Sequence, residues 1–135
     1  MARKTIEVDW DNDEHTIIRE MFIGRWTWNE FYEVARDVPP MMTATPHTVH
    51  ILADFRQSGP LPIGPAIIHA RNTVQHLPDN WGIMVIVTPS MFIRTMVDVF
   101  RRMFPGRVAE KTFAVRELEE AYALMEQYGA AQTAS

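Results

Sequence analysis

Asp54 lies at the end of a predicted buried strand near the middle of this 135-residue chain, where a carboxylate could bind a ligand or partner. Residues 47–55 are apolar and β-branched and predict a strand, and residues 63–76 predict a helix. A Gly/Pro-rich loop over residues 56–62 joins them. Ligands of open α/β sheets bind where the carboxyl end of a strand faces a helix N-terminus. We therefore expect Asp54 at a binding edge, with an Asx-type turn that only caps the loop as the alternative.

Two hydroxyl-bearing loops are further candidates. Ser58 and Gly59 present a hydroxyl beside a flexible backbone, where phosphorylation would add about two negative charges and repel an acidic partner. A turn chosen for its geometry is the alternative there. Thr88 and Ser90 follow the next predicted strand, and we expect them beside the loop after Asp54 because neighbouring parallel strands end at one edge. Together the loops would bind an anion through helix N-termini, while Ser90 would serve equally as a plain N-cap.

The helix predicted after Ser90, which runs to about Phe104, carries more apolar side chains than one buried face needs. A helix lying on a sheet needs an apolar stripe about 100° wide, whereas Phe92, Met96 and Phe100 belong to a set that covers more than one face. The surplus, rich in Met and Phe, favours a second apolar contact with another copy of the chain, a partner protein or a lipid-like ligand. Extra burial under neighbouring helices is the alternative.

A capping box begins the first predicted helix. In Thr27-Trp28-Asn29-Glu30, the Thr27 hydroxyl accepts the Glu30 N–H, and the Glu30 side chain accepts the Thr27 N–H. We expect the helix to run to about Asp37 and to end at Pro39-Pro40, because proline lacks the N–H that a helix interior requires.

Composition argues against several classes of function. The chain has no cysteine, which rules out disulfides, thiolate catalysis and cysteine metal sites. Its net charge of −4 argues against a nucleic-acid partner. His69 and His76 share one predicted helix but are too far apart for a typical zinc pair, and no Ser–His–Asp arrangement or carboxylate pair follows from the spacing. We therefore expect no metal, no cofactor and no catalytic residue.

The chain shows no apolar segment of the signal-peptide kind near residue 1, and its longest apolar run, residues 83–87, is too short to span a bilayer. We therefore expect a cytoplasmic protein without a membrane span.

Strand and helix patterns alternate along the chain, after two leading strands that form a hairpin. This order predicts an α/β fold with a mixed, mostly parallel sheet of about five strands, an N-terminal hairpin and four helices. We expect one domain over residues 1–135, with an ordered core over residues 5–128 and a flexible tail over residues 129–135. The expected strands are residues 5–10, 15–23, 48–55, 81–88 and 112–115, and the expected helices are residues 27–37, 63–76, 90–104 and 117–128.

This order of elements resembles the STAS family, the fold of bacterial anti-sigma-factor antagonists and of the cytoplasmic tails of sulfate transporters. The resemblance covers about residues 5–128. It also rests on Val49–Asp54, an apolar strand ending in a polar residue, and on Thr112–Ala121, which looks like the family's last strand leading into an acidic-start helix. It implies a non-catalytic domain that binds a partner or small ligand at the strand-end edge.

The chain departs from the antagonists at their phosphorylation switch. Those proteins carry an Asp-Ser-Ser-Gly-like segment at the start of the second helix, whereas Pro62–Pro65 occupies that place here and contains no hydroxyl. The chain therefore resembles the divergent STAS-like proteins that lack the switch. We predict a regulatory interaction domain, docking a protein partner or a second copy through the strand-end loops and the apolar third helix. The alternative is a small-molecule or lipid-like ligand-binding protein with a pocket between those elements.

Overall fold

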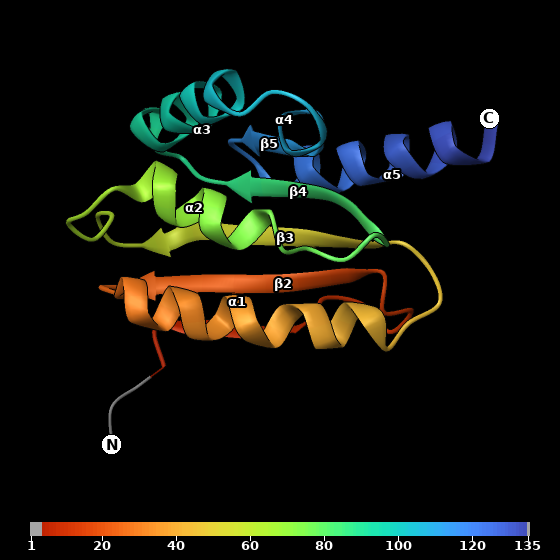
Figure 1. Ribbon diagram of the computed structural model, residues 1–135, viewed down its shortest axis with the longest axis horizontal. Helices are drawn as coiled ribbons and strands as arrows, with labels where there is room; N and C mark the ends of the chain where they lie inside the picture. The colour runs from red at the N-terminus through yellow and green to blue at the C-terminus, as the bar shows by residue number, and fades with distance from the viewer. Residues whose placement is uncertain (1–3, 135) are drawn as a thin grey trace.

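The computed structural model describes residues 4–134, with side chains as far as residue 130, and contains a five-stranded sheet flanked by helices (Figure 1). The sheet order is β1-β2-β3-β4-β5, so every strand pairs with its neighbour in sequence. β1 and β2 form an antiparallel hairpin, and the other three pairings are parallel. This confirms the predicted α/β class. The strands are β1 (Ile6–Trp10), β2 (Ile17–Gly24), β3 (Val49–Ser58), β4 (Trp81–Val87) and β5 (Thr112–Val115).

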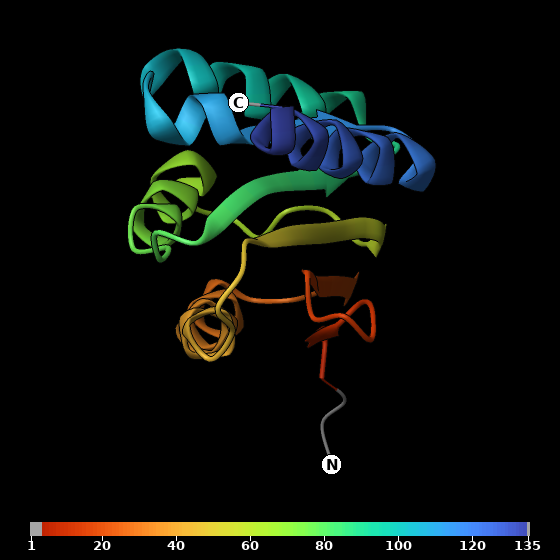
Figure 2. The same cartoon turned by 90° about the vertical axis from the view of Figure 1, so that its right-hand side faces the viewer.

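Helices cover both faces of the sheet (Figures 1 and 2). Because the three parallel crossovers all advance the sheet in one direction, right-handed connections place α1, α2 and α3 on one face. α5 covers the other face, where Ala121 and Met125 pack with Leu52 and Val85. The short α4 is absent from the sequence prediction, because five residues are too few to show a helical period. The helices are α1 (Trp28–Thr43), α2 (Ala66–Val74), α3 (Met91–Met103), α4 (Arg107–Lys111) and α5 (Leu118–Ala134).

α1 begins at the predicted capping box but does not end where the sequence suggested. The helix continues through Pro39 and Pro40, so the expected end near Asp37 is wrong. Each proline removes one intrahelical hydrogen bond. Val38 and Met42 are 2% and 0% exposed and pack into the core beneath the helix. Burying side chains of this size contributes about 1.5–3 kcal/mol each, which offsets the lost bonds.

The connection between β3 and α2 differs from the predicted one. β3 extends to Ser58 because its last two residues pair with the end of β2. α2 begins only at Ala66, since Pro65 occupies its N-cap position and the residue before a proline avoids helical backbone angles. That preceding residue is Gly64, whose φ of 137° is a conformation that glycine adopts readily. The loop is therefore a fixed, non-helical segment at the carboxyl edge of the sheet.

The last helix is longer than its sequence pattern, since α5 continues past Tyr128 to Ala134. Ser135 and residues 1–3 lie outside the described residues. None of the helices in the described part of the chain is both long and apolar enough to cross a membrane.

Successive side chains of β2 point to opposite faces of the sheet, as in any strand. Ile18 and Phe22 belong to the two apolar clusters under α1, whereas Ile17 packs with the cluster under α5. Glu20 lies between Ile18 and Phe22 in this alternation and so faces the layer of α1, α2 and α3. A carboxylate on an inward-facing position of a central strand is the feature around which the candidate site is built.

Candidate ligand-binding site

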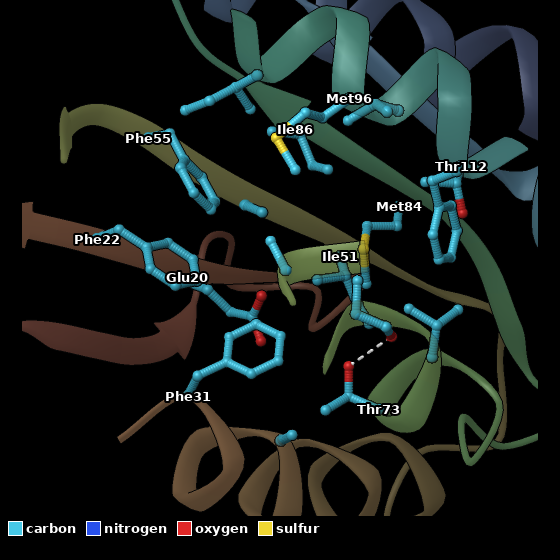
Figure 3. Close-up of a pocket in the computed structure, with 18 of the residues that line it drawn as sticks. Glu20, Phe22, Phe31, Ile51, Phe55, Thr73, Met84, Ile86, Met96 and Thr112 are labelled. Atoms are coloured by element: carbon cyan, nitrogen blue, oxygen red, sulfur yellow. Dashed lines mark hydrogen bonds between the residues drawn. The ribbon is translucent and has the colours of Figure 1, made fainter. Parts of the chain in front are cut away.

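A cavity of about 130 Å³ lies between the sheet and the layer formed by α1, α2 and α3 (Figure 3). It is lined mainly by aliphatic and aromatic side chains from four strands and all three helices. The N–H groups of its two tryptophans bond to other parts of the protein, Trp26 to Ser58 Oγ and Trp28 to the Ile63 carbonyl. The remaining polar lining residues are Glu20, Thr73 and Thr112.

Small side chains explain why this space is open. Ala53 on β3 and Ala35 on α1 line the cavity, and α2 contributes Ala66 and Ala70. Along α2 only Val74 is buried, so the helix does not fill the space between itself and the sheet. The cavity is therefore a consequence of which residues α2 presents inward.

α2 is attached to its neighbours along its sides. The Tyr32 hydroxyl of α1 lies 2.6 Å from His69 Nδ1, and Asn72 donates to the same hydroxyl at 3.2 Å. On the other side, the Arg71 guanidinium lies 5.0 Å from the centre of the Phe104 ring. These contacts hold α2 above the sheet while leaving the space beneath it open.

Glu20 is the ionisable group of this cavity. Its side chain lies between Phe22 and Phe31, with the carboxylate turned into the open space (Figure 3). Within the described part of the chain, the Glu20 carboxylate makes no hydrogen bond and no ion pair. Burial raises the pKa of Glu20 from 4.5 to about 7.

A second unpaired polar atom lies at the opposite wall. Thr112 is 2% exposed, and its Oγ1 has no hydrogen-bond partner among the described residues. Thr112 is on β5 and Glu20 is on β2, so three strand spacings separate them, which is about 14 Å across the sheet. The space is therefore mainly apolar, with the Glu20 carboxylate near one end and the buried Thr112 side chain near the other.

Aromatic rings surround the Glu20 end. The Phe22 ring centre lies 4.2 Å from that of Phe55, 5.0 Å from that of Trp26 and 6.4 Å from that of Phe31. Trp28 contacts the same group, 5.4 Å from Phe31. Rings at these distances form a continuous wall, since aromatic pairs interact at centroid separations of about 4.5–7 Å.

A surface groove adjoins the cavity at the carboxyl edge of the sheet. It lies between the loops after β3 and β4, which confirms that these two loops are neighbours. Phe55, Leu61 and Ile93 line both the groove and the cavity, so the two spaces adjoin each other. Five of the predicted site residues line this groove: Ser58, Gly59, Thr88, Ser90 and Phe92.

The hydroxyls of the groove have internal partners. Ser58 Oγ accepts the Trp26 indole N–H at 2.9 Å and donates to the Gly59 carbonyl at 2.8 Å. Thr88 is 1% exposed, and its Oγ1 accepts the Ser90 N–H. Ser90 is the N-cap of α3, with its hydroxyl accepting the Ile93 N–H at 3.2 Å. These bonds fix the loops, and the expected N-cap role of Ser90 is confirmed.

The apolar residues predicted on α3 divide between two locations. Met96 and Phe100 line the cavity, and Phe100 is only 5% exposed. Met91 and Phe92, by contrast, are 73% and 67% exposed at the start of the helix. The helix therefore has one inward face that closes the cavity and a separate exposed apolar end at the groove.

Asp54 lies away from both the groove and the cavity. β3 continues past it, and its side chain faces α5, where it is 1% exposed. Its Oδ2 accepts from Arg19 at 2.7 Å and from Arg56 at 2.8 Å. Burial alone would raise the pKa of Asp54, but the hydrogen bonds from Arg56 and Arg19 outweigh it and lower the pKa to about 2. The expected position of Asp54 beside the next helix N-terminus is not found.

The other polar contacts on that face complete a network. Arg19 also lies 3.9 Å from Asp11, which accepts the Tyr122 hydroxyl of α5 at 2.7 Å. His50, on the same face of β3, accepts the Ile83 N–H through Nδ1, and burial lowers its pKa to about 4. Among the described residues, no group of three or more His, Asp or Glu side chains could hold a metal ion.

Comparison with known proteins adds no assignment. No family model matches the chain, and no curated protein matches it. The candidate site therefore rests on its own geometry. Glu20 is not among the site residues predicted from the sequence, although an acidic residue between Ile18 and Phe22 in an alternating strand is a detectable signal.

Proposed function

We propose that this protein is a non-catalytic binding protein that holds a small apolar molecule in the cavity beneath α2. The cavity itself is the observation that carries the proposal. Its lining is almost entirely apolar, and lining residues such as Ala70 and Met96 are only partly buried. A ligand that fills the space would remove this apolar surface from water, which contributes about 25 cal/mol for each Å² buried.

A STAS-like regulatory domain is consistent with this proposal. The order of elements and the sequential sheet support it, and they agree with the resemblance of Val49–Asp54 and Thr112–Ala121 to the family. The phosphorylation switch of the antagonists has no equivalent serine here, and the Ser58 hydroxyl is already bonded to Trp26. We infer that an occupied cavity, in place of a phosphoserine, is the signal that such a domain would transmit.

A substitution that fills the cavity with a larger side chain tests the proposal. We expect propylbenzene to bind the wild-type protein and to shift the methyl NMR signals of residues that line the cavity. Ala70→Phe places a ring in the same space, so we expect it to lower propylbenzene affinity by at least about tenfold, because the ligand loses its apolar contacts. Isothermal titration calorimetry measures the change.

Ile68→Phe is the matched control, because Ile68 is on the same helix but 41% exposed. It should bind propylbenzene like the wild type. Circular dichroism confirms that both variants keep the fold. Equal affinity in wild type and folded Ala70→Phe would refute the cavity as the binding site.

Docking of a protein partner is a second candidate, favoured by the exposed Met91 and Phe92 at the start of α3. If this apolar end joins two copies of the chain, light scattering after size exclusion will give a dimer for the wild type and a monomer for Phe92→Asp, because a charge would be buried in the interface. Phe100 does not report on this surface, since it is buried. A wild-type monomer at high protein concentration would exclude the self-association form of the proposal.

A further inference from the structure

The ligand class follows from Glu20 and the rings around it, on the condition that the cavity is a binding site as proposed above. We propose that the cavity binds a hydrophobic cation, an apolar amine whose ammonium group pairs with the Glu20 carboxylate between aromatic rings.

The carboxylate of the half-buried Glu20 has no protein partner among the described residues. Buried ionisable groups are normally hydrogen-bonded or paired, because an isolated charge in an apolar environment is strongly destabilising. Within the described part of the chain Glu20 has neither kind of partner, although it faces the cavity beside Phe22 and Phe31 (Figure 3). A ligand that donates hydrogen bonds and carries a positive charge supplies what the protein does not.

The rings next to Glu20 favour the same charge. The faces of aromatic rings are electronegative, so they attract a cation within about 6 Å and repel an anion. Phe22, Trp26 and Phe31 are neighbours at the Glu20 end, with ring centres 5.0–6.4 Å apart. A carboxylate flanked by the Phe22 and Phe31 rings is therefore a suitable partner for an ammonium group (Figure 3).

A negatively charged ligand has no counter-charge in this cavity. Apart from Glu20, none of the described residues that line it is Asp, Lys, Arg or His. The residues opposite Glu20 on the neighbouring strands are Val8 and Ala53, and α1 presents Phe31 and Ala35 to the same space. A fatty acid or a phosphate ester placed here would meet Glu20 without any basic group.

The size of the cavity sets the size of the ligand. A buried water needs about 10–15 Å³ measured in the same way, so 130 Å³ corresponds to on the order of ten non-hydrogen atoms. The aliphatic lining beyond the rings, including Ile86 and Met96, suits a hydrocarbon body (Figure 3).

Three probes of equal size test the proposal: phenethylamine, phenethyl alcohol and propylbenzene. At about pH 8 Glu20 is mostly ionised and an alkylammonium is still protonated, so we expect phenethylamine to bind at least about tenfold more tightly than propylbenzene. Between about pH 8 and pH 5.5 this advantage should disappear, because Glu20 becomes protonated and no other ionisable side chain faces it in the described cavity lining.

Glu20→Gln removes the charge and keeps the shape of the side chain. We expect it to lower phenethylamine affinity at least about tenfold and to leave propylbenzene affinity unchanged or higher. Glu7→Gln, on an exposed residue of β1, should bind all three probes like the wild type. Calorimetry gives the affinities, and NMR shifts of cavity methyl groups locate the probe.

Two outcomes overturn the proposal in different ways. If propylbenzene binds as tightly as phenethylamine at both pH values, the hydrophobic-cation class is wrong while the cavity remains a binding site. If none of the three probes binds the wild-type protein, the proposed binding function fails together with the ligand class.

Discussion

Glu20→Gln is expected to make the unliganded protein more stable at pH 8 and to change its stability little at pH 4.5. The pKa of Glu20 is about 7 in the folded protein and 4.5 in its ordinary state, so folding favours the protonated side chain. In the wild type, the contribution of protonated Glu20 to the free energy of unfolding is fully present below pH 4.5 and is lost as the pH rises through about 7. A pKa difference of this size corresponds to about 3 kcal/mol in the free energy of unfolding. Glutamine does not titrate, so the variant does not lose this stability at high pH.

Urea unfolding of both proteins at the two pH values measures the difference in the free energy of unfolding. Glu7→Gln on the exposed side of β1 is the control and should follow the wild type at both pH values. If Glu20→Gln gives the same increase at pH 4.5 as at pH 8, the effect does not come from ionisation of this carboxylate.

Asp54→Ala is expected to destabilise the fold by about 3 kcal/mol at neutral pH, because it leaves Arg19 and Arg56 without the carboxylate that both contact. The pKa of Asp54 is lowered in the fold, so its contribution is present above pH 3.8 and is lost as the pH falls toward about 2. The difference between wild type and variant should therefore shrink in that acidic window. Chemical unfolding at neutral and acidic pH measures it.

Asp54→Ala should lower the stability of the protein without changing its affinity for a ligand in the cavity. Asp54 faces α5, on the side of the sheet opposite the cavity, so folded Asp54→Ala should bind propylbenzene like the wild type. Asp13→Ala, in the exposed turn between β1 and β2, is the control and should leave stability nearly unchanged. A large loss of ligand affinity in folded Asp54→Ala would show that this residue acts on the binding site after all.

Local signals in the sequence were reliable where a few adjacent residues decide the structure. The capping box of Thr27 and Glu30 and the N-cap of Ser90 each depend on four consecutive residues, and both are present. The strands also followed from runs of β-branched and apolar residues, since these pack well on a pleated sheet. The α/β class and the N-terminal hairpin therefore came from the sequence.

Features that depend on distant residues could not be predicted in this way. α1 passes through Pro39 and Pro40 because Val38 and Met42 are buried beneath it, and the sequence does not reveal that burial. The cavity requires Glu20 on β2 to face Ala70 of α2, which lies fifty residues later in the chain. Asp54 was expected at the end of its strand, beside the next helix N-terminus, whereas β3 continues to Ser58 and leaves Asp54 inside the sheet.

The order of the strands has a consequence for how the chain folds. Each strand of the described sheet pairs with its sequence neighbour, so no strand must be inserted between two that are already paired. The sheet's parallel pairings still join residues 28 to 34 positions apart, which slows their formation, but the sheet can grow strand by strand in the order of synthesis. One bond runs against that order: Tyr122 of α5 reaches back to Asp11, 111 residues earlier. The N-terminal hairpin thus acquires this last tie only when nearly the whole chain has left the ribosome.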